Sequence, residues 1–486
     1  LPLVIPLRDY AKALDVENVI ANFFFNKHDI RITSKMFAQL NRMGKLLLIF
    51  DGFDEMAARV DKQAMINNFW ELARVVGPGA KAILTCRTEH FPAAKQGRKL
   101  LSAELQASTK NLTGEPPEFE VLELEKFNES QIRTMLSNKT DGTMVETVMS
   151  NAKLMELAER PVMVDLILDA LPKIESLDDV GELNMSRVYL YAVTRRLEKD
   201  WQEKRTFTSM ADKLYFLCEV SWEMLQTDQM SLHFTSFPER LQTLFGDKVR
   251  EQKDLDHWHY DMMGQAMLVR DDEGNYRPAH RSLLEFFAAY NIIASLGVIE
   301  EEFLEIARSQ SNISKAAKAK NFTWEQYFSR QCHQNSSLVY IPPLNSFNTE
   351  SFQQLFSLIG ENGLTKALVD LASLMLDPLT AKEKILKIIQ QTKGKTINEV
   401  GYVANNLIQL ILRRDYHALE NADLCETTLP GVNLANVSLR HTLLRQARLD
   451  NPTFTKVLAA VYTLAFSPDG KLLAVGDDSG TVQLWN

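Results

Sequence analysis

Residues 46–55 read Leu-Leu-Leu-Ile-Phe-Asp-Gly-Phe-Asp-Glu, so an apolar run is followed by three acidic residues within five positions. Five apolar side chains in a row predict a strand buried on both faces, as in a parallel sheet covered by helices. Open α/β sheets bind ligands beyond the carboxyl ends of their strands, and Asp51 would lie at such an end. A carboxylate there can hold a hydrated Mg²⁺ ion, while Asp54 or Glu55 can orient an attacking water. The stretch therefore predicts a site of nucleotide hydrolysis, and the simpler alternative is a core strand that runs into an acidic turn.

The segments that follow favour an α/β unit. Apolar residues recur at near-helical spacing over 60–76, and a Gly-Pro-Gly sequence ends that run. A second strand is predicted at 81–85 and a third at 119–124. Arg87 follows the second strand, where a guanidinium can contact a γ-phosphate beside the metal site. Taken alone, an arginine in this position is more often a surface residue.

The order of these segments resembles the NACHT class of signal-transduction ATPases. The resemblance rests on Ile-Pro-Leu-Arg at 5–8, the acidic strand at 46–55, Leu-Thr-Cys-Arg-Thr at 84–88 and Glu-Val-Leu-Glu-Leu at 120–124. In that family these segments are the second strand, the Walker B strand, the sensor-1 strand and the last strand of the nucleotide domain. The resemblance covers roughly the first 300 of the 486 residues.

The resemblance implies a set of ligands and residue roles. The ligands are ATP or ADP with Mg²⁺, Asp51 binds the metal, Asp54 and Glu55 are catalytic, and Arg87 contacts nucleotide. One departure is large, because no Gly-x-x-x-x-Gly-Lys-Ser/Thr sequence occurs in the chain. Without the backbone amides and lysine of that loop, a triphosphate loses its main cradle. We therefore expect this chain to be a fragment that binds ATP weakly and does not hydrolyse it, and we expect the parent protein to do both.

Two later positions match nucleotide contacts of the same family. Pro161 opens an apolar helix, and proline suits a first turn because its missing N–H is not needed there. Residues 266–278 read as two short strands around a turn, and His280 then starts a helix. A hairpin joined to helices resembles the winged-helix domain of these ATPases. The resemblance implies that Pro161 packs on adenine and His280 contacts the β-phosphate of ADP; a first-turn proline and a capping histidine are the alternatives.

Composition limits the classes of function. A chain of 486 residues exceeds the ~250–300 residues at which single cores stop growing, so several domains are expected. The net charge of −9 gives no electrostatic reason to expect nucleic-acid binding. Four cysteines lie far apart without metal-ligand spacing, which indicates reduced thiols in a cytoplasmic protein. No stretch is apolar enough to span a membrane, and no signal-peptide pattern is present.

Leucine recurs at every fifth position near the C-terminal end. A step of five residues turns a helical side chain by about 140° and moves a strand side chain to the other face, so neither element aligns the leucines. A square coil with one inward apolar residue on each side does align them, and the pattern resembles the pentapeptide-repeat β-solenoid. The repeating residues are Leu424, Leu429, Leu434, Leu439, Leu444, Leu449 and Phe454.

Residues 461–485 predict three short strands separated by Ser-Pro-Asp-Gly and Asp-Asp-Ser-Gly turns. The string ends in Trp485-Asn486 and resembles the first blade of a WD-repeat β-propeller. Propellers close with about 4–8 blades, so the remaining blades are expected beyond this chain. A lone β-meander is the alternative, but it would leave its edge strands unprotected.

The sequence therefore predicts a multidomain α/β plus α-helical protein that ends in a β-solenoid and the start of a propeller. We expect a nucleotide-dependent switch, in which a protein ligand on the repeats promotes exchange of ADP for ATP, homo-oligomerisation and signalling in defence. The alternative is a non-catalytic protein-interaction scaffold with a structural nucleotide domain. Neither nucleic acid nor a membrane is an expected partner. The expected segments are a partial nucleotide-binding domain (1–125), a helical domain (126–204), a winged-helix domain (205–300), a helical spacer (301–415), a pentapeptide-repeat segment (416–456) and the first WD blade (457–486).

Overall fold

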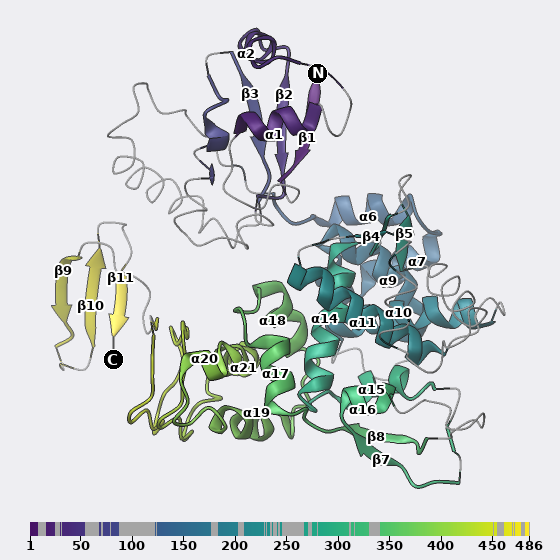
Figure 1. The fold of residues 1–486 in the computed structure, drawn as a ribbon, viewed down its shortest axis with the longest axis vertical. Coiled ribbons are helices and arrows are strands. Elements are labelled where there is room, and N and C mark those ends of the chain that lie inside the picture. The colour runs from purple at the N-terminus through teal and green to yellow at the C-terminus, as the bar shows by residue number, and fades with distance from the viewer. Residues whose placement is uncertain are drawn as a thin grey trace. The chain divides into compact units, whose positions relative to one another are not determined.

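Contacts within the computed structural model separate Leu1–Lys126 from Phe127–Asn486, and each unit is described by itself (Figure 1). The residues that the structure describes are 1–7, 16–24, 30, 32–53, 68–69, 71–77, 79–86, 122, 124–175, 183–202, 209–227, 229, 231–233, 236, 241, 244, 267–270, 275–278, 280–310, 313–314, 316–329, 341–450, 452–453, 461–468, 470, 472–477 and 482–485.

A parallel sheet lies at the centre of the first unit. Its strands are β1 (Pro2–Pro6), β2 (Leu47–Asp51) and β3 (Lys81–Leu84), in the order β1-β2-β3. The register pairs Pro6 with Asp51, so the carboxyl ends of β1 and β2 meet at one edge of the sheet. Asp51 thus ends the middle strand, at the edge where open α/β sheets bind their ligands.

Two helices accompany this sheet, α1 (Val16–Asn22) and α2 (Ser34–Arg42). Leu48 and Phe50 of β2 are buried and share one hydrophobic cluster with side chains of both helices. The side chains that alternate with them along β2 are only partly buried. The strand is therefore fully buried on one face, whereas its apolar run predicted burial on both, because successive side chains of a strand point to opposite faces.

The second unit is mainly helical up to Arg414. Asn128 and Ser351 each form a reciprocal capping box at a helix start. Strands β4, β6 and β5 form a small antiparallel sheet, and β7 pairs in parallel with β8. The helices are α6 (Glu129–Ser137), α7 (Gly142–Ser150), α8 (Ala152–Ala158), α9 (Pro161–Ile174), α10 (Met185–Gln202), α11 (Met210–Thr227), α14 (Arg281–Ser295), α15 (Glu301–Ala307), α16 (Trp324–Ser329), α17 (Phe352–Ile359), α18 (Lys366–Ser373), α19 (Ala381–Gln390), α20 (Ile397–Val400) and α21 (Val403–Arg414); the strands are β4 (Leu232–His233), β5 (Leu268–Arg270), β6 (Asn275–Pro278), β7 (Lys320–Phe322) and β8 (Leu344–Phe347).

Helix α14 lies at the centre of the second unit's core. Each of its residues from Leu283 to Ser295 is buried, and it packs against α11 and α18. A single hydrophobic cluster extends from Ile132 to Leu434. It includes helices on both sides of the boundaries that we expected after residues 204, 300 and 415. These segments therefore share one core, although they were expected as separate domains.

Residues 416–453 form coils in which positions twenty apart lie side by side. Isolated parallel bridges join Asp423 to Leu443, Thr428 to Arg448 and Asn433 to Thr453. The backbone turns into the left-handed region once in every five residues, so four five-residue segments complete one coil. The positive φ angles lie between 58° and 65° and occur at Asn421, Glu426, Gly431, Asn436, His441 and Gln446.

The first coil packs on the loop between α19 and α20. The Lys393 ammonium lies 2.7 Å from the Asp423 carboxylate, and the hydroxyl of Thr428 donates to the Lys395 carbonyl at 2.7 Å. The Gly394 amide donates to the carbonyl of Glu426. The helices thus satisfy polar groups at the start of the solenoid and cap its first coil. Accordingly Leu424, Leu429 and Leu434 are buried, whereas Leu439, Leu444 and Leu449 are only partly buried.

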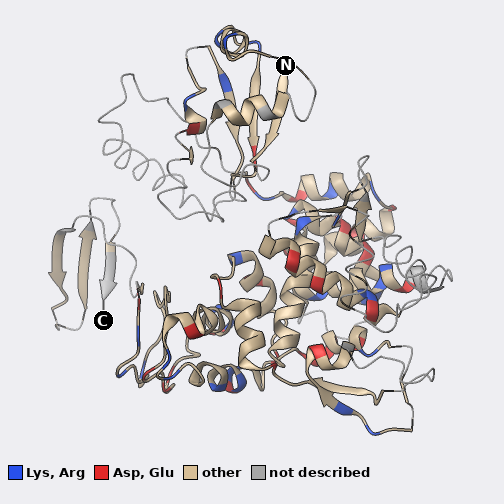
Figure 2. Cartoon of the chain, in the orientation of Figure 1, with Lys and Arg blue, Asp and Glu red and all other residues tan. Residues whose placement is uncertain are grey.

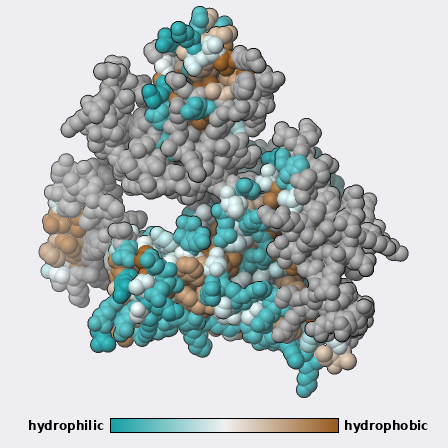
Figure 3. All heavy atoms as spheres, viewed as in Figure 1, coloured by the Kyte–Doolittle hydropathy of each residue, from teal (hydrophilic) through white to brown (hydrophobic). Residues whose placement is uncertain are grey.

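The last described strands form a separate antiparallel sheet in the order β11-β10-β9. The strands are β9 (Val461–Phe466), β10 (Leu473–Asp477) and β11 (Val482–Trp485). Leu464 and Phe466 lie two residues apart, hence on one face, and are 62% and 72% exposed. Figure 3 shows the hydrophobic colouring of this sheet on the molecular surface.

Candidate functional site

The carboxyl ends of β2 and β3 are joined by hydrogen bonds around Thr85. Its hydroxyl donates to Oδ1 of Asp51 at 2.6 Å and accepts from the Gly52 amide at 2.9 Å. The Phe53 amide donates to the Thr85 carbonyl at 3.0 Å. Gly52 has a φ of +77°, which glycine adopts without a Cβ clash, so the chain turns immediately after Asp51. The exposed Asp51 carboxylate is therefore held in place from the neighbouring strand.

The Asp51 carboxylate at this strand end is a suitable ligand for Mg²⁺. Mg²⁺ keeps several waters and is bound through one or two carboxylates together with substrate phosphates, so the single carboxylate of Asp51 fits such a role. Thr85 orients that carboxylate, and the sequence did not single it out. Asp54, Glu55 and Arg87, the predicted catalytic and phosphate-contacting residues, lie outside the described residues. Within the part of the chain that the structure describes, no group of three or more His, Cys, Asp or Glu side chains could hold a metal ion.

Pro161 and His280 each begin a helix of the second unit. Pro161 is the first residue of α9, where its missing N–H removes no helical hydrogen bond. His280 is the N-cap of α14, and its Nδ1 accepts a hydrogen bond from the Ser282 amide at 3.1 Å. Both residues therefore have a sufficient structural explanation. A role in nucleotide binding needs a further observation that brings the two helix starts together.

Tyr189 of α10 interacts with groups near both of these helix starts. Its ring is buried and stacks on Phe286 with centroids 5.4 Å apart. Its hydroxyl is hydrogen-bonded to the side chain of Ser282, near the start of α14. Burial raises the pKa of Tyr189 to about 12, while the Ser282 hydrogen bond and the nearby positive charge of Arg160 act to lower that pKa. The pKa of Tyr189 is thus influenced both by Ser282, near the start of α14, and by Arg160, which precedes α9; no sequence motif indicated this tyrosine.

The groups at these two helix starts suit an anion. The amino end of a helix carries partial positive charge and free backbone amides. Arg160 precedes Pro161, is exposed, and makes no side-chain cap to α9. Asp51 belongs to the first unit, whereas Pro161 and His280 belong to the second.

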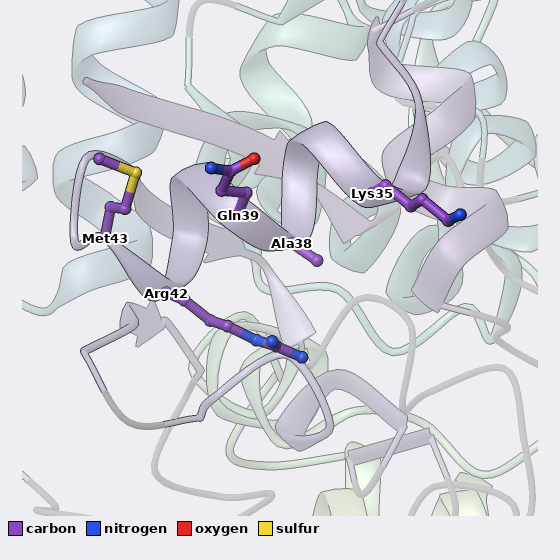
Figure 4. Close-up of a pocket in the computed structure, with 5 residues that line it drawn as sticks. All are labelled: Lys35, Ala38, Gln39, Arg42 and Met43. Carbon is purple, nitrogen blue, oxygen red and sulfur yellow. The ribbon is translucent and has the colours of Figure 1, made fainter.

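The surface of α2 forms a shallow pocket in the first unit. Figure 4 shows its lining side chains projecting from one helix. They include two cations and neither an acid nor a nucleophile, so we assign no chemistry to this pocket. The lining residues are Lys35, Ala38, Gln39, Arg42 and Met43. In the described helices, none is both long and apolar enough to cross a membrane.

Comparison with known proteins identifies the C-terminal sheet. The sequence model of the family "WD domain, G-beta repeat" matches residues 453–486. The expectation of a WD repeat is therefore confirmed for the segment that contains β9, β10 and β11.

Two relatives carry the same term in their names. An uncharacterized WD repeat-containing protein of Nostoc sp. strain PCC 7120 is 56% identical over 486 residues, which are 100% of this chain and 31% of the relative. A second uncharacterized WD repeat-containing protein of that strain is 30% identical over 104 residues, which are 21% of this chain and 8% of the relative. The chain thus spans about a third of the length of the first relative.

Proposed function

We propose that this protein is a protein-interaction scaffold whose C-terminal repeats bind other proteins. The observation that carries the proposal is the WD repeat at 453–486, because propellers built from such repeats present extended binding surfaces. Leu464 and Phe466 are exposed on one face of the described sheet, and Val482 is 70% exposed. Exposed apolar patches of this kind mark contact surfaces. The coils of residues 416–453 support the proposal, since their first coil is attached to the α19–α20 loop of the helical core.

The scaffold function predicts a partner whose binding depends on this sheet and not on nucleotide. A tagged full chain would be used to isolate candidate partners, each of which must then bind the purified chain in isothermal titration. Leu464→Asp with Phe466→Asp is expected to weaken binding at least ~10-fold, since burying an unpaired carboxylate costs more than the ~1.4 kcal/mol of one decade. Met36→Asp with Met43→Asp, at two exposed methionines of the first unit, is the matched control.

Two results would contradict the scaffold function. One is that no purified partner distinguishes the sheet variant from the control. The other is that saturating Mg-ATP or Mg-ADP changes the affinity for the partner, which a structural nucleotide domain would not do.

We propose as a second candidate the nucleotide-dependent switch of NACHT type. Two observations favour it: Asp51 ends the middle strand of a parallel sheet, and the electrostatics of Tyr189 depend on Ser282 near the start of α14 and on Arg160 before α9. Asp51 would hold Mg²⁺, with Asp54 or Glu55 positioning water and Arg87 contacting the γ-phosphate. Pro161 and His280 would contact bound ADP and stabilise a closed state. Opening, ATP exchange and self-association would follow the binding of a protein ligand to the repeats.

The switch predicts that His280 retains ADP in a protein that also carries a phosphate-binding loop. A charge-assisted hydrogen bond contributes about 1.5–3 kcal/mol, so His280→Ala is expected to speed ADP release by about 10–100-fold. Stopped-flow release of a fluorescent ADP measures this rate. His417→Ala removes an exposed histidine that is paired with Glu420, and serves as the control. An unchanged release rate in His280→Ala would leave His280 as the helix cap that the structure describes.

A further inference from the structure

The second coil of the solenoid carries a concentrated positive charge. Residues 440–448 read Arg-His-Thr-Leu-Leu-Arg-Gln-Ala-Arg and include no acidic residue, in a chain whose net charge is −9. Arg440, Arg445 and Arg448 are all exposed. We call these three residues the arginine band. Figure 2 shows that both basic and acidic residues occur along the coils.

Two acidic residues of the first coil, Asp423 and Glu420, already have partners. Lys393 lies 2.7 Å from Asp423 and lowers the pKa of Asp423 to about 2. Glu420 accepts a hydrogen bond from Ser438 and lies 2.7 Å from Nδ1 of His417. These contacts hold the pKa of Glu420 below its usual value. Asp423 and Glu420 are therefore compensated within the first coil and its neighbouring loop, whereas the exposed Glu426 belongs to the same coil.

The band itself is not neutralised by ion pairs. Among the residues that the structure describes, none forms a salt bridge within 4.0 Å of Arg440, Arg445 or Arg448. Arg440 and Arg448 influence the pKa values of Glu420 and Glu399 only through longer-range electrostatics. Three guanidinium groups thus present their hydrogen-bond donors to solvent on one coil.

An exposed apolar side chain lies within the band. Leu443 is 57% exposed and stacks above Asp423 of the first coil. Leu443 and Arg445 lie on the side between the turns at His441 and Gln446, whereas Arg440 precedes the first turn and Arg448 follows the second. Arg440 and Arg445 therefore flank Leu443 along the chain, and Arg448 lies on the next side of the coil.

We propose that the arginine band and Leu443 bind an acidic polypeptide segment that carries an apolar side chain among its carboxylates. Guanidinium groups form bidentate hydrogen bonds with carboxylates, and Leu443 can contact an apolar side chain. A nucleic acid fits less well. Its phosphates could pair with the guanidinium groups, but it offers no aliphatic side chain that would contact Leu443.

This proposal names one binding surface for the scaffold function and rests on that function for its role in the cell. The surface is separate from the WD repeat, so the two proposals fail in different experiments. Loss of partner binding in the Leu464 and Phe466 variant tests the repeat. Binding of a synthetic acidic peptide tests the band alone.

The probe is a fluorescein-labelled synthetic peptide of repeated Glu-Glu-Leu-Glu, titrated with the full chain and followed by fluorescence anisotropy. Exposed ion pairs contribute about 0.2–1 kcal/mol each, and charge reversal replaces attraction by repulsion at two sites. Arg440→Glu with Arg445→Glu is therefore expected to weaken binding about 10-fold. Lys318→Glu with Lys382→Glu makes the same change in net charge at two exposed lysines outside the band and is expected to leave binding within about 2-fold.

Three further measurements decide the chemistry of the partner. A peptide with Gln in place of Glu is expected not to bind, and added salt is expected to weaken binding of the acidic peptide. Leu443→Ala is expected to weaken the leucine-containing peptide more than an all-glutamate peptide. Equal affinity in the band variant and the lysine control would overturn the proposal. Tighter binding of a single-stranded oligonucleotide than of the peptide would overturn it in favour of a nucleic-acid surface.

Discussion

Replacing Gly401 by alanine is expected to unfold the region around α17, α20 and the first solenoid coil. Gly401 links α20 to α21 with φ +50° and ψ −138°, a conformation that L-residues rarely adopt. A Cβ there would lie 2.0 Å from the carbonyl oxygen of Gly360 and 2.8 Å from its carbonyl carbon. Both contacts are with backbone, so no side-chain rotation relieves them. The combined strain and overpacking are expected to cost at least about 3 kcal/mol.

Hydrogen exchange by mass spectrometry is the measurement for this variant, because a protein with several domains need not unfold in one step. Peptides that cover 352–360 and 397–434 are expected to exchange faster. Gly394→Ala is the matched control, since Gly394 also has a positive φ, +70°, but nothing within 4 Å of the added Cβ. Gly394→Ala should lower the stability by only ~1–2 kcal/mol, the cost of placing an L-residue in the left-handed region. Equal effects in the two variants would show that φ alone, and not the contact with Gly360, makes Gly401 necessary.

Replacing Glu219 by glutamine is expected to stabilise the second unit above pH 6. Oε1 of Glu219 accepts hydrogen bonds from Trp324 Nε1 at 2.8 Å and from Asn291 Nδ2 at 3.2 Å. Burial raises the pKa of Glu219 from 4.5 to about 6, and these two hydrogen bonds only partly oppose that rise. Glu325 of α16 and Glu350, which lies between β8 and α17, raise the pKa further.

The sign of the pH dependence follows from the raised pKa. The folded protein holds the Glu219 proton more tightly than the unfolded chain, so this contribution to stability is complete below pH 4.5 and is lost as the pH rises through about 6. A shift of about 1.5 units corresponds to at most ~2 kcal/mol. Glutamine keeps an acceptor oxygen for Trp324 and Asn291 and carries no charge. Its benefit should therefore grow between pH 4.5 and about 6 and stay constant at higher pH.

Thermal unfolding of the two proteins across this pH range tests the expectation. The midpoints should agree below pH 4.5, diverge as the pH rises to about 6, and keep a constant difference above it, with the glutamine variant higher. Glu383→Gln is a control of opposite sign, because Lys387 lowers the pKa of the exposed Glu383 carboxyl. Parallel curves for wild type and Glu219→Gln would show that Glu219 ionises in the folded protein as readily as in the unfolded chain.

Local patterns were the reliable part of the sequence. The apolar run before Asp51 predicted a strand that ends at this residue, and β2 ends there. Proline at the start of an apolar helix and histidine before another gave the starts of α9 and α14, because capping and first-turn preferences depend on neighbouring backbone groups alone. The candidate nucleotide site was harder to predict from the sequence. Thr85 and Tyr189 connect segments far apart in the chain, and neither belongs to a local motif.

The sequence by itself determined the five-residue period of the tail and the WD repeat that follows it, because both are short-range repeats whose side-chain spacing repeats in every unit. Only the tertiary structure decided that residues 132–434 share one core and that Lys393 caps the first coil at Asp423, while no described residue forms such an ion pair with the arginines of the second coil. These outcomes depend on which surfaces meet. Burial and ion pairing act between residues that are close in space, whatever their separation along the chain.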